Sequence, residues 1–184
     1  MNASFTVFHW NGDFLWKLCA RDSDSLYKFE HENRDFFEKM VPTRGDDYYV
    51  PEEFMKRHES LLKEQEKGDS YFYLIKDKGR SILGRINLVD INKQQRKGHL
   101  GYRVGKDYIG MGVAKRALAM LLEHMKDLEV HQIHAKTTAN NIASQQVLVK
   151  NGFTYKGTSA EMFEMNGENL KFVFYEWNSK GFVG

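Results

Sequence analysis

The sequence predicts a mixed α+β protein, and three observations support that fold class. Apolar residues recur at helical spacing in two segments of the N-terminal third, around positions 26–40 and 54–62. The middle of the chain alternates apolar and polar residues, as half-buried strands do. The second half alternates strand-like and helix-like segments. This order favours a central, mostly antiparallel sheet flanked by helices.

The N-terminal third is expected to hold two strand-like runs and two helices, at positions 5–8, 14–18, 26–40 and 51–67. Asp22 or Ser23 is a suitable N-cap for the first helix, because its side-chain oxygen can accept a hydrogen bond from a free backbone N–H. Pro51 suits the first turn of the second helix, and Gly68 suits its C-terminal end.

The remainder of the chain is expected to form strands at 70–76, 82–88, 99–104, 132–137 and 171–177, and helices at 114–125 and 142–151. Lys78 and Gly79 form a turn signal between the first two of these strands. Gly152 follows the last helix and is typical of a helix end. The segment 157–170 carries three glutamates. It is interpreted either as a solvated loop or as a segment whose negative charge attracts a cationic acceptor.

Length and composition limit the function classes. The 184 residues fit a single domain spanning positions 1–184. The 27 Lys and Arg residues nearly balance the 25 Asp and Glu residues, which excludes a strongly basic nucleic-acid binder. Cys19 is the single cysteine, so we expect a reducing compartment and no internal disulfide. No signal peptide and no membrane-spanning segment is expected, and the predicted location is the cytoplasm.

No metal site is indicated by the sequence. His131 and His134 lie three residues apart on a predicted strand, so their side chains point to opposite faces. The metalloprotease pattern His-Glu-x-x-His is also absent, because Leu62 follows His58 and Glu59 where the second histidine would stand.

A glycine-rich segment, 104–114, joins a predicted strand to the N-terminus of a predicted helix. Free backbone N–H groups and the positive end of the helix dipole make such a junction suitable for an anion, although a plain turn would have the same composition. The segment lacks the Gly-Lys-Ser/Thr ending of a P-loop. It also has Lys115 where the third glycine of a dinucleotide fingerprint would stand.

Two segments at a fixed separation resemble the GNAT acetyltransferase superfamily. Gly112 and Ala114 match the end of the family's Gln/Arg-x-x-Gly-x-Gly/Ala loop, although Ile109 stands where Gln or Arg is usual. The segments 141–144 and 148–153 resemble the Asn-x-x-Ser and Leu-x-Lys-x-Gly-Phe patterns of the branch that acetylates the N-terminal alanine or serine of ribosomal proteins. Further likeness to that branch lies at 33–34, 41–42 and 101–102.

The resemblance implies acetyl-CoA as cosubstrate and a GNAT-like sheet with splayed strands. The strand ending at Val104 would diverge from the strand beginning near Gln132. The pantetheine arm would pair with the backbone of Tyr102, Arg103 and Val104. The pyrophosphate would lie on the backbone amides of Gly110, Met111, Gly112, Val113, Ala114 and Lys115. Lys115 and Arg116 would screen its charge.

Three further residues are candidates for the chemistry. Leu148 stands where many members of the family have a tyrosine that protonates the departing thiolate, so Ser144 is the candidate donor; it would otherwise be an ordinary first-turn serine. Asn141 would orient the thioester, cap the helix, or both. His99 replaces a glutamate of the branch and is either the general base or an exposed residue at the end of a strand.

The predicted function is transfer of an acetyl group from acetyl-CoA to a primary amine, with the N-terminal amine of a ribosomal protein as the first acceptor to test. Two alternatives stay open: a small-amine acetyltransferase acting on a polyamine, amino acid or antibiotic, and a non-catalytic acyl-CoA-binding module. Nucleic acid and membrane partners are not expected. The sequence does not determine the acceptor, and it leaves a homodimer open.

Overall fold

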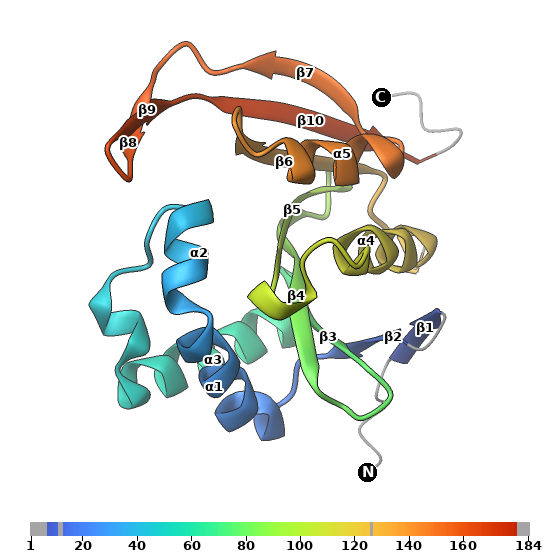
Figure 1. Cartoon of the computed structure of the whole chain (residues 1–184). Helices are drawn as coiled ribbons and strands as arrows, with labels where there is room; N and C mark the ends of the chain where they lie inside the picture. Colours follow the sequence, from blue (N-terminus) through green and yellow to red (C-terminus); the bar gives the residue numbers. More distant parts are fainter. Residues whose placement is uncertain (1–6, 11–12, 126, 180–184) are drawn as a thin grey trace.

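The computed structural model of the chain describes residues 7–10, 13–125 and 127–179 (Figure 1). The strands are β1 (Val7–Trp10), β2 (Asp13–Lys17), β3 (Tyr71–Lys76), β4 (Ile82–Asn92), β5 (Lys97–Val104), β6 (Gln132–Thr138), β7 (Thr154–Thr158), β8 (Phe163–Met165), β9 (Glu168–Leu170) and β10 (Phe172–Asn178). The α-helices are α1 (Ser23–Glu32), α2 (Arg34–Met40), α3 (Pro51–Lys67), α4 (Val113–Glu123) and α5 (Ile142–Lys150). The mixed α+β prediction is therefore confirmed.

Eight strands form one sheet in the order β1-β2-β3-β4-β5-β6-β10-β7. Neighbouring strands are antiparallel throughout, except that β5 and β6 run parallel. β8 and β9 form a separate two-stranded hairpin. A parallel pair needs a crossover connection, and α4 supplies it between β5 and β6.

Helices cover both faces of the sheet, and each face has its own apolar core (Figure 1). The alternation along β3 divides the two cores. Phe72 and Leu74 pack with α1, α2 and α3, whereas Tyr73 and Ile75 pack with α4. We refer to these faces as the α1–α3 face and the α4 face.

The helix expected over 26–40 is in fact two helices, α1 and α2, which meet at Asn33. Asn33 has φ −103° and ψ 5°, outside helical geometry, and its side chain donates a hydrogen bond of 2.8 Å to the carbonyl oxygen of Phe29. Apolar periodicity continues through the break, because Phe29 and Phe37 still pack against each other. The sequence pattern therefore concealed the interruption.

Two other expectations need correction. The segment 157–170 is not one open loop, because it contains the end of β7 and the β8–β9 hairpin. Asn166 at the hairpin tip donates hydrogen bonds of 3.3 Å to the carbonyl oxygens of Glu38 and Lys39, which joins the hairpin to the end of α2. The first strand was expected at 5–8; the structure has it at Val7–Trp10, and positions 5 and 6 lie outside the described residues.

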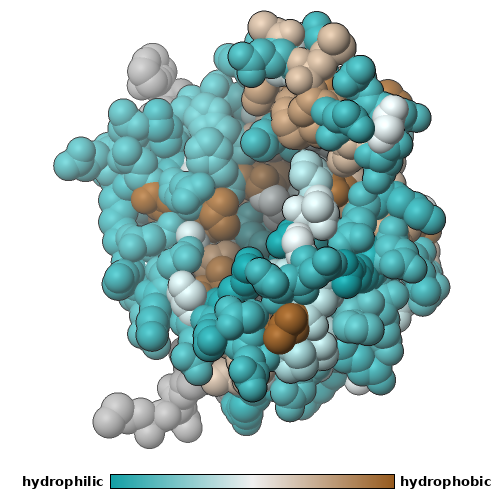
Figure 2. All heavy atoms as spheres, turned by 90° about the vertical axis from the view of Figure 1, so that its left-hand side faces the viewer, coloured by the Kyte–Doolittle hydropathy of each residue, from teal (hydrophilic) through white to brown (hydrophobic). Residues whose placement is uncertain are grey.

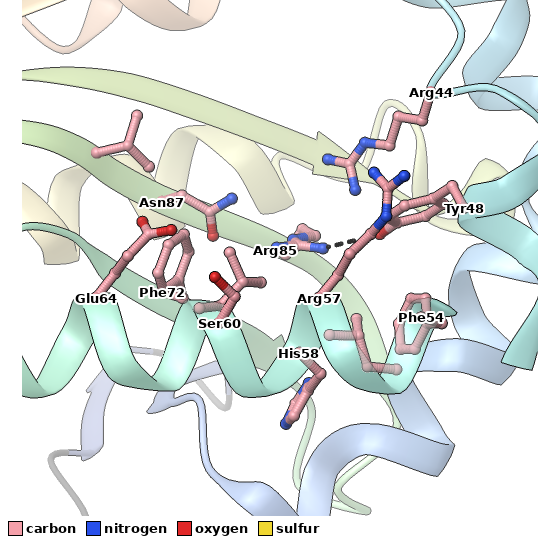
Figure 3. Close-up of a pocket in the computed structure, with 13 residues that line it drawn as sticks. Arg44, Tyr48, Phe54, Arg57, His58, Ser60, Glu64, Phe72, Arg85 and Asn87 are labelled. Atoms are coloured by element: carbon pink, nitrogen blue, oxygen red, sulfur yellow. Dashed lines mark hydrogen bonds between the residues drawn. The ribbon is translucent and has the colours of Figure 1, made fainter. Parts of the chain in front are cut away.

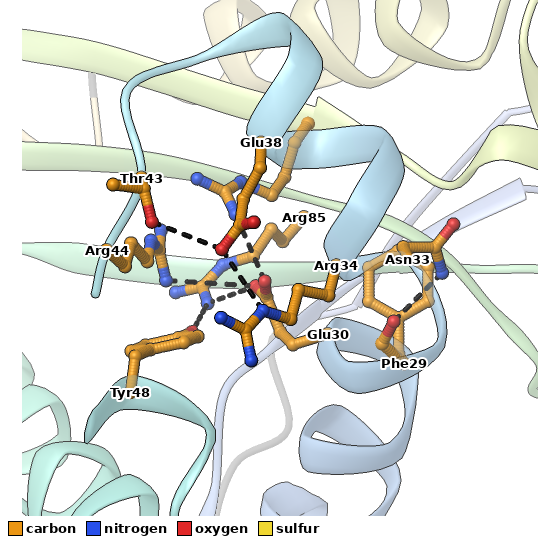
Figure 4. A network of polar contacts seen from close by, with 10 residues as sticks. Phe29, Glu30, Asn33, Arg34, Glu38, Thr43, Arg44, Tyr48 and Arg85 are labelled. Carbon is orange, nitrogen blue, oxygen red and sulfur yellow. Dashed lines mark hydrogen bonds and ion pairs between the residues drawn. The ribbon is translucent and has the colours of Figure 1, made fainter. Parts of the chain in front are cut away.

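A buried carboxylate joins the helices of the α1–α3 face to the sheet (Figure 4). Glu30 of α1 is fully buried, and its two oxygens accept hydrogen bonds from Arg85 of β4 at 2.9 Å and from Arg103 of β5 at 3.1 Å. Arg44 lies 3.9 Å from the same carboxylate. Burial by itself raises the pKa of Glu30, but the three guanidinium groups outweigh it and hold the pKa below its usual value.

We expect Glu30→Gln to lower the free energy of unfolding by about 3–5 kcal/mol at neutral pH, because it leaves buried guanidinium groups without their counter-charge. A carboxylate whose pKa is lowered by folding stabilises above its unfolded pKa of about 4.3, and this contribution is lost as the pH falls through the lowered folded value. The free energies of unfolding of the two proteins, measured with urea across pH 3–7, should therefore differ at neutral pH and converge only at the acidic end. Glu32→Gln, on the exposed side of the same helix, is the matched control. Equal stability of Glu30→Gln and wild type at neutral pH would contradict this account.

Candidate active site

The sheet opens between β5 and β6. These strands pair only from Lys97 opposite Gln132 to Leu100 opposite Ala135. Beyond that point β6 continues beside β10, while β5 continues beside β4 as far as Val104. In Figure 1 the end of the sheet that contains β6, β10 and β7 accordingly lies apart from the other strands. The predicted divergence is confirmed, and the edge of Gly101–Val104 that faces β6 has no strand partner within the described part of the chain.

The glycine-rich segment begins where this free edge ends. It passes through a 3-10 turn at Lys106–Tyr108 and reaches α4 at Val113. Gly110 and Gly112 have φ values of +79° and +74°, a region that suits glycine and strains other residues. A Cβ atom at Gly110 would meet nothing within 4 Å, so the backbone is open to a ligand there. The first-turn N–H groups of α4 and this exposed loop form an anion-binding geometry.

Both ends of the loop are fixed by side chains. Asn33 accepts a hydrogen bond of 2.8 Å from the backbone N–H of Lys106, and a Cβ atom at Gly105 would lie 2.9 Å from Phe29. At the other end, Nη1 of Arg116 donates to the carbonyl oxygen of Met111 at 2.7 Å. Arg116, expected only as a screening cation, thus also holds the loop backbone.

Ser144 and Tyr102 meet beside the opening, on the α4 face. Their hydroxyl oxygens are 2.9 Å apart, and the Tyr102 hydroxyl also donates to the carbonyl oxygen of Ser144 at 3.2 Å. Burial raises the pKa of Tyr102 to about 12, so this hydroxyl keeps its proton at neutral pH. Asn141 accepts a hydrogen bond of 3.1 Å from the Ser144 backbone N–H, which confirms that it caps α5.

His99 lies on the opposite face of β5 from Tyr102, because the two residues are three positions apart on a strand. Its ring is exposed and lies 5.4 Å from the ring of His134, its cross-strand partner on β6. Nδ1 of His134 is 3.8 Å from a carboxylate oxygen of Glu176 on β10. Burial, opposed by Glu176 and assisted by the neighbouring His99, lowers the pKa of His134.

A cavity of about 500 Å³ lies on the same face as His99, between α3 and β4 (Figure 3). Asn87 on its wall is the cross-strand partner of Gly101, and a Cβ atom at Gly101 would meet nothing within 4 Å. The open space above Gly101 therefore lies between the cavity and His99. Figure 2 views the molecule from the side of α2 and the β8–β9 hairpin, where the largely hydrophilic surface is hollowed near its middle.

The structure thus divides the predicted site residues between two faces of one forked sheet. Tyr102, Ser144 and Asn141 lie together on the α4 face, next to the loop that contains Gly110 and Gly112. His99 lies on the α1–α3 face. Within the described residues, no three His, Cys, Asp or Glu side chains are close enough together to hold a metal ion, and none of the helices is long and apolar enough to cross a membrane.

Sequence reasoning missed three features of this region: the side chain of Tyr102, the pair formed by His134 and Glu176, and the arginines around the cavity. The contact of His99 with His134 follows from the parallel pairing of β5 and β6, because each histidine is two residues past the first paired position of its strand. Spacing within one strand could not reveal a contact between two strands.

A forked sheet beside a glycine-rich helix N-terminus, with polar side chains at the fork, defines a GNAT-type acyltransferase. The family model described as the acetyltransferase (GNAT) domain matches residues 14–154, so the chain belongs to the GNAT acetyltransferase family. This membership makes the protein an acetyltransferase.

Known relatives agree with this assignment. Probable N-acetyltransferase YjcK of Bacillus subtilis (strain 168) is 29% identical over 157 residues, which are 84% of this chain and 87% of that protein. The ribosomal-protein-S5-alanine acetyltransferase of Vibrio fischeri superimposes with a TM-score of 0.89 at 21% identity, covering 97% of this chain and 100% of the other. RimL, a ribosomal L7/L12 alpha-N-protein acetyltransferase solved with coenzyme A, gives a TM-score of 0.85 at 18% identity, covering 94% and 97%.

Proposed function

We propose that the protein transfers the acetyl group of acetyl-CoA to the α-amine of a polypeptide. The observation that carries this proposal is the fork between β5 and β6, which leaves a free strand edge beside an exposed glycine-rich loop. Two of the structures with the same fold are enzymes named for acetylating ribosomal proteins, and one of them was solved with coenzyme A.

The free edge and the loop are the proposed binding site for acetyl-CoA. The backbone of Tyr102, Arg103 and Val104 is available to pair with an extended amide-containing chain, as another strand would. The amides from Gly110 to Lys115 surround the positive end of α4, where a pyrophosphate is stabilised. When bound there, acetyl-CoA supplies the activated acyl group.

The acceptor is proposed to approach from the α1–α3 face, through the open space above Gly101. An α-amine with a pKa of about 7.7–8.0 requires only about 1.4 kcal/mol to be neutral at pH 7, whereas a lysine amine at about 10.4 requires about 4.6 kcal/mol. An exposed histidine such as His99 is an adequate base for the first of these and a weak one for the second.

In the proposed reaction the amine nitrogen forms a bond to the thioester carbon, the carbon–sulfur bond breaks, and the nitrogen loses a proton. His99 is positioned to accept that proton, directly or through water. Burial lowers the pKa of His134 beside it, which favours the neutral imidazole, and Glu176 lies on its far side. The three side chains lie in a row across β5, β6 and β10, so the Glu176 carboxylate is placed to stabilise positive charge that develops on this row.

Ser144 and Tyr102 are proposed to stabilise the departing sulfur from the α4 face. With its pKa raised to about 12, Tyr102 gives up its proton far less readily than a thiol with an ordinary pKa of about 8.5. When the Tyr102 hydroxyl donates to Oγ of Ser144, the Ser144 hydroxyl is left to donate a hydrogen bond to the developing thiolate, which then takes up a proton through solvent.

Incubation of the protein with acetyl-CoA and synthetic peptides tests the proposed function. A peptide with a free N-terminal alanine or serine should release free thiol, and mass spectrometry should locate the acetyl group on the α-nitrogen. A matched peptide with a blocked N-terminus and an internal lysine should react at least about tenfold more slowly, because its amine is harder to deprotonate. Transfer only to lysine or to small amines would overturn the peptide α-amine as acceptor.

Ser144→Ala should lower kcat by roughly 10–10³-fold, and Tyr102→Phe should have an effect of similar size, because each removes part of one hydrogen-bonded unit. The double variant should be little slower than the slower single variant, since residues that act as a unit are not additive. Steady-state kinetics give these values, with Ser81→Ala on the exposed β3–β4 turn as control. Additive losses in the double variant would show that the two hydroxyl groups act separately.

His99→Gln should lower kcat/KM for an α-amine peptide by about 10²-fold and flatten the acidic limb of its pH profile. The reason is that a general base acts only in its deprotonated form, so its removal takes away the corresponding rise of the rate with pH. His134→Gln should change the same limb more weakly, whereas His124→Gln, just past the C-terminal end of α4, should leave it in place. A profile measured across pH 5.5–9 that keeps its acidic limb without His99 assigns the base to another group.

A further inference from the structure

The side chains around Glu30 carry more positive than negative charge. Arg85, Arg103 and Arg44 all contact the Glu30 carboxylate, so three guanidinium groups share one carboxylate and a surplus of two positive charges results. Burial, and then repulsion from Arg103 and Arg85, lowers the pKa of Arg44. The guanidinium groups therefore repel one another, and a second anion would relieve that repulsion.

This surplus charge faces the 500 Å³ cavity (Figure 3). Arg44, Arg57 and Arg85 point toward one end of the cavity, around Tyr48. The guanidinium carbons of Arg44 and Arg57 lie 4.5 Å and 5.7 Å from the centre of the Tyr48 ring. Among the described residues that line the cavity, the one carboxylate belongs to Glu64, which Figure 3 shows at the opposite end.

Three residues that line the cavity carry a buried polar atom without a hydrogen-bond partner among the described residues: Arg85, Asn87 and His58. The ring of His58 points away from the arginines (Figure 3), so the atoms of Arg85 and Asn87 are the ones available to a ligand there. Nε of Arg85 is a charged donor, and Arg85 is only 3% exposed. Oδ1 of Asn87 is an acceptor, and Asn87 lies between Arg85 and the space above Gly101. A buried donor and a buried acceptor without partners are costly, typically about 1–3 kcal/mol each, unless a ligand satisfies them.

We propose that this cavity binds an anionic group of the acceptor, a carboxylate or a phosphate, between Arg44, Arg57 and Arg85. The inference rests on the proposed function and specifies its substrate: a polypeptide with an acidic side chain close behind its N-terminal amine. Guanidinium groups bind such oxyanions through paired, charge-assisted hydrogen bonds, which are stronger than neutral ones. Oδ1 of Asn87 would accept an N–H of the intervening peptide backbone.

The register of the sheet sets the spacing between amine and anion. Arg85 is the cross-strand partner of Arg103, two residues beyond Gly101 and four beyond His99. At about 3.3 Å per residue, the Arg85–Arg103 pair lies about 7 Å from Gly101 and about 13 Å from His99 along β5. An extended peptide advances about 3.3–3.6 Å per residue, so an acidic side chain at its second or third position can span this range.

The test compares peptides that differ only at the second and third residues, with Glu, phosphoserine, Gln or Lys at either position. Wild-type kcat/KM should favour the Glu and phosphoserine peptides over the Gln peptide by about tenfold or more, and the Lys peptide should be the poorest. Arg57→Gln and Arg44→Gln should bring the Glu-to-Gln ratio close to one, mainly through KM. Lys56→Gln, the neighbouring exposed cation on α3, is the matched control and should keep the wild-type ratio.

Equal kcat/KM for the Glu and Gln peptides in the wild type would overturn the anion site, even though both peptides were acetylated. A ratio that survives both arginine substitutions would also overturn it. Failure of the proposed function gives a different result, in which no peptide is acetylated at its α-amine. In that case, acetylation of the small amines glutamate or aminoethyl phosphate with the same dependence on Arg44 and Arg57 would support the anion site and reject the peptide.

Discussion

The Glu30 carboxylate is the contact on which the rest of the site depends. It attaches α1 to β4 and β5 at once, because its oxygens bind Arg85 and Arg103 on adjacent strands. The α1–α2 junction that follows places Asn33 against the start of the glycine-rich loop. A single buried charge thereby fixes the helices of one face, the strand edge at the fork, and the orientation of the arginines around the cavity. Its burial requires those arginines, and their surplus charge is the basis of the proposed anion site.

The fork between β5 and β6 divides the candidate site residues between the two faces of the sheet. Because side chains alternate along β5, Tyr102 and His99 point away from each other, Tyr102 toward α5 and His99 toward the face that also holds the cavity. In the proposed reaction the thioester and the amine meet where the strands part, beyond Leu100. On this geometry, the proposed stabilisation of the thiolate and the proposed removal of the amine proton fall to side chains on opposite faces of the sheet.

The sequence was sufficient for most elements, for the fork and for the loop, because these depend on local periodicity, on glycine positions and on two spaced motifs. It failed where the determinants were non-local. The break at Asn33 interrupts no apolar pattern, and the contact of His99 with His134 depends on strand register. Glu30 contacts Arg44, Arg85 and Arg103, which lie 14 to 73 positions away from it in the sequence. Such contacts follow from packing, which single-sequence patterns do not encode.

The division of the site between two faces is the central claim, and backbone amide chemical shifts test it most directly. Titration of ¹⁵N-labelled protein with coenzyme A should shift the amides of Tyr102–Val104 and Gly110–Lys115, while those of Arg85 and Asn87 change little. Subsequent addition of an acidic-side-chain peptide should shift Arg85, Asn87 and His99. Coenzyme A shifts centred on the cavity, with the loop unchanged, would contradict the account.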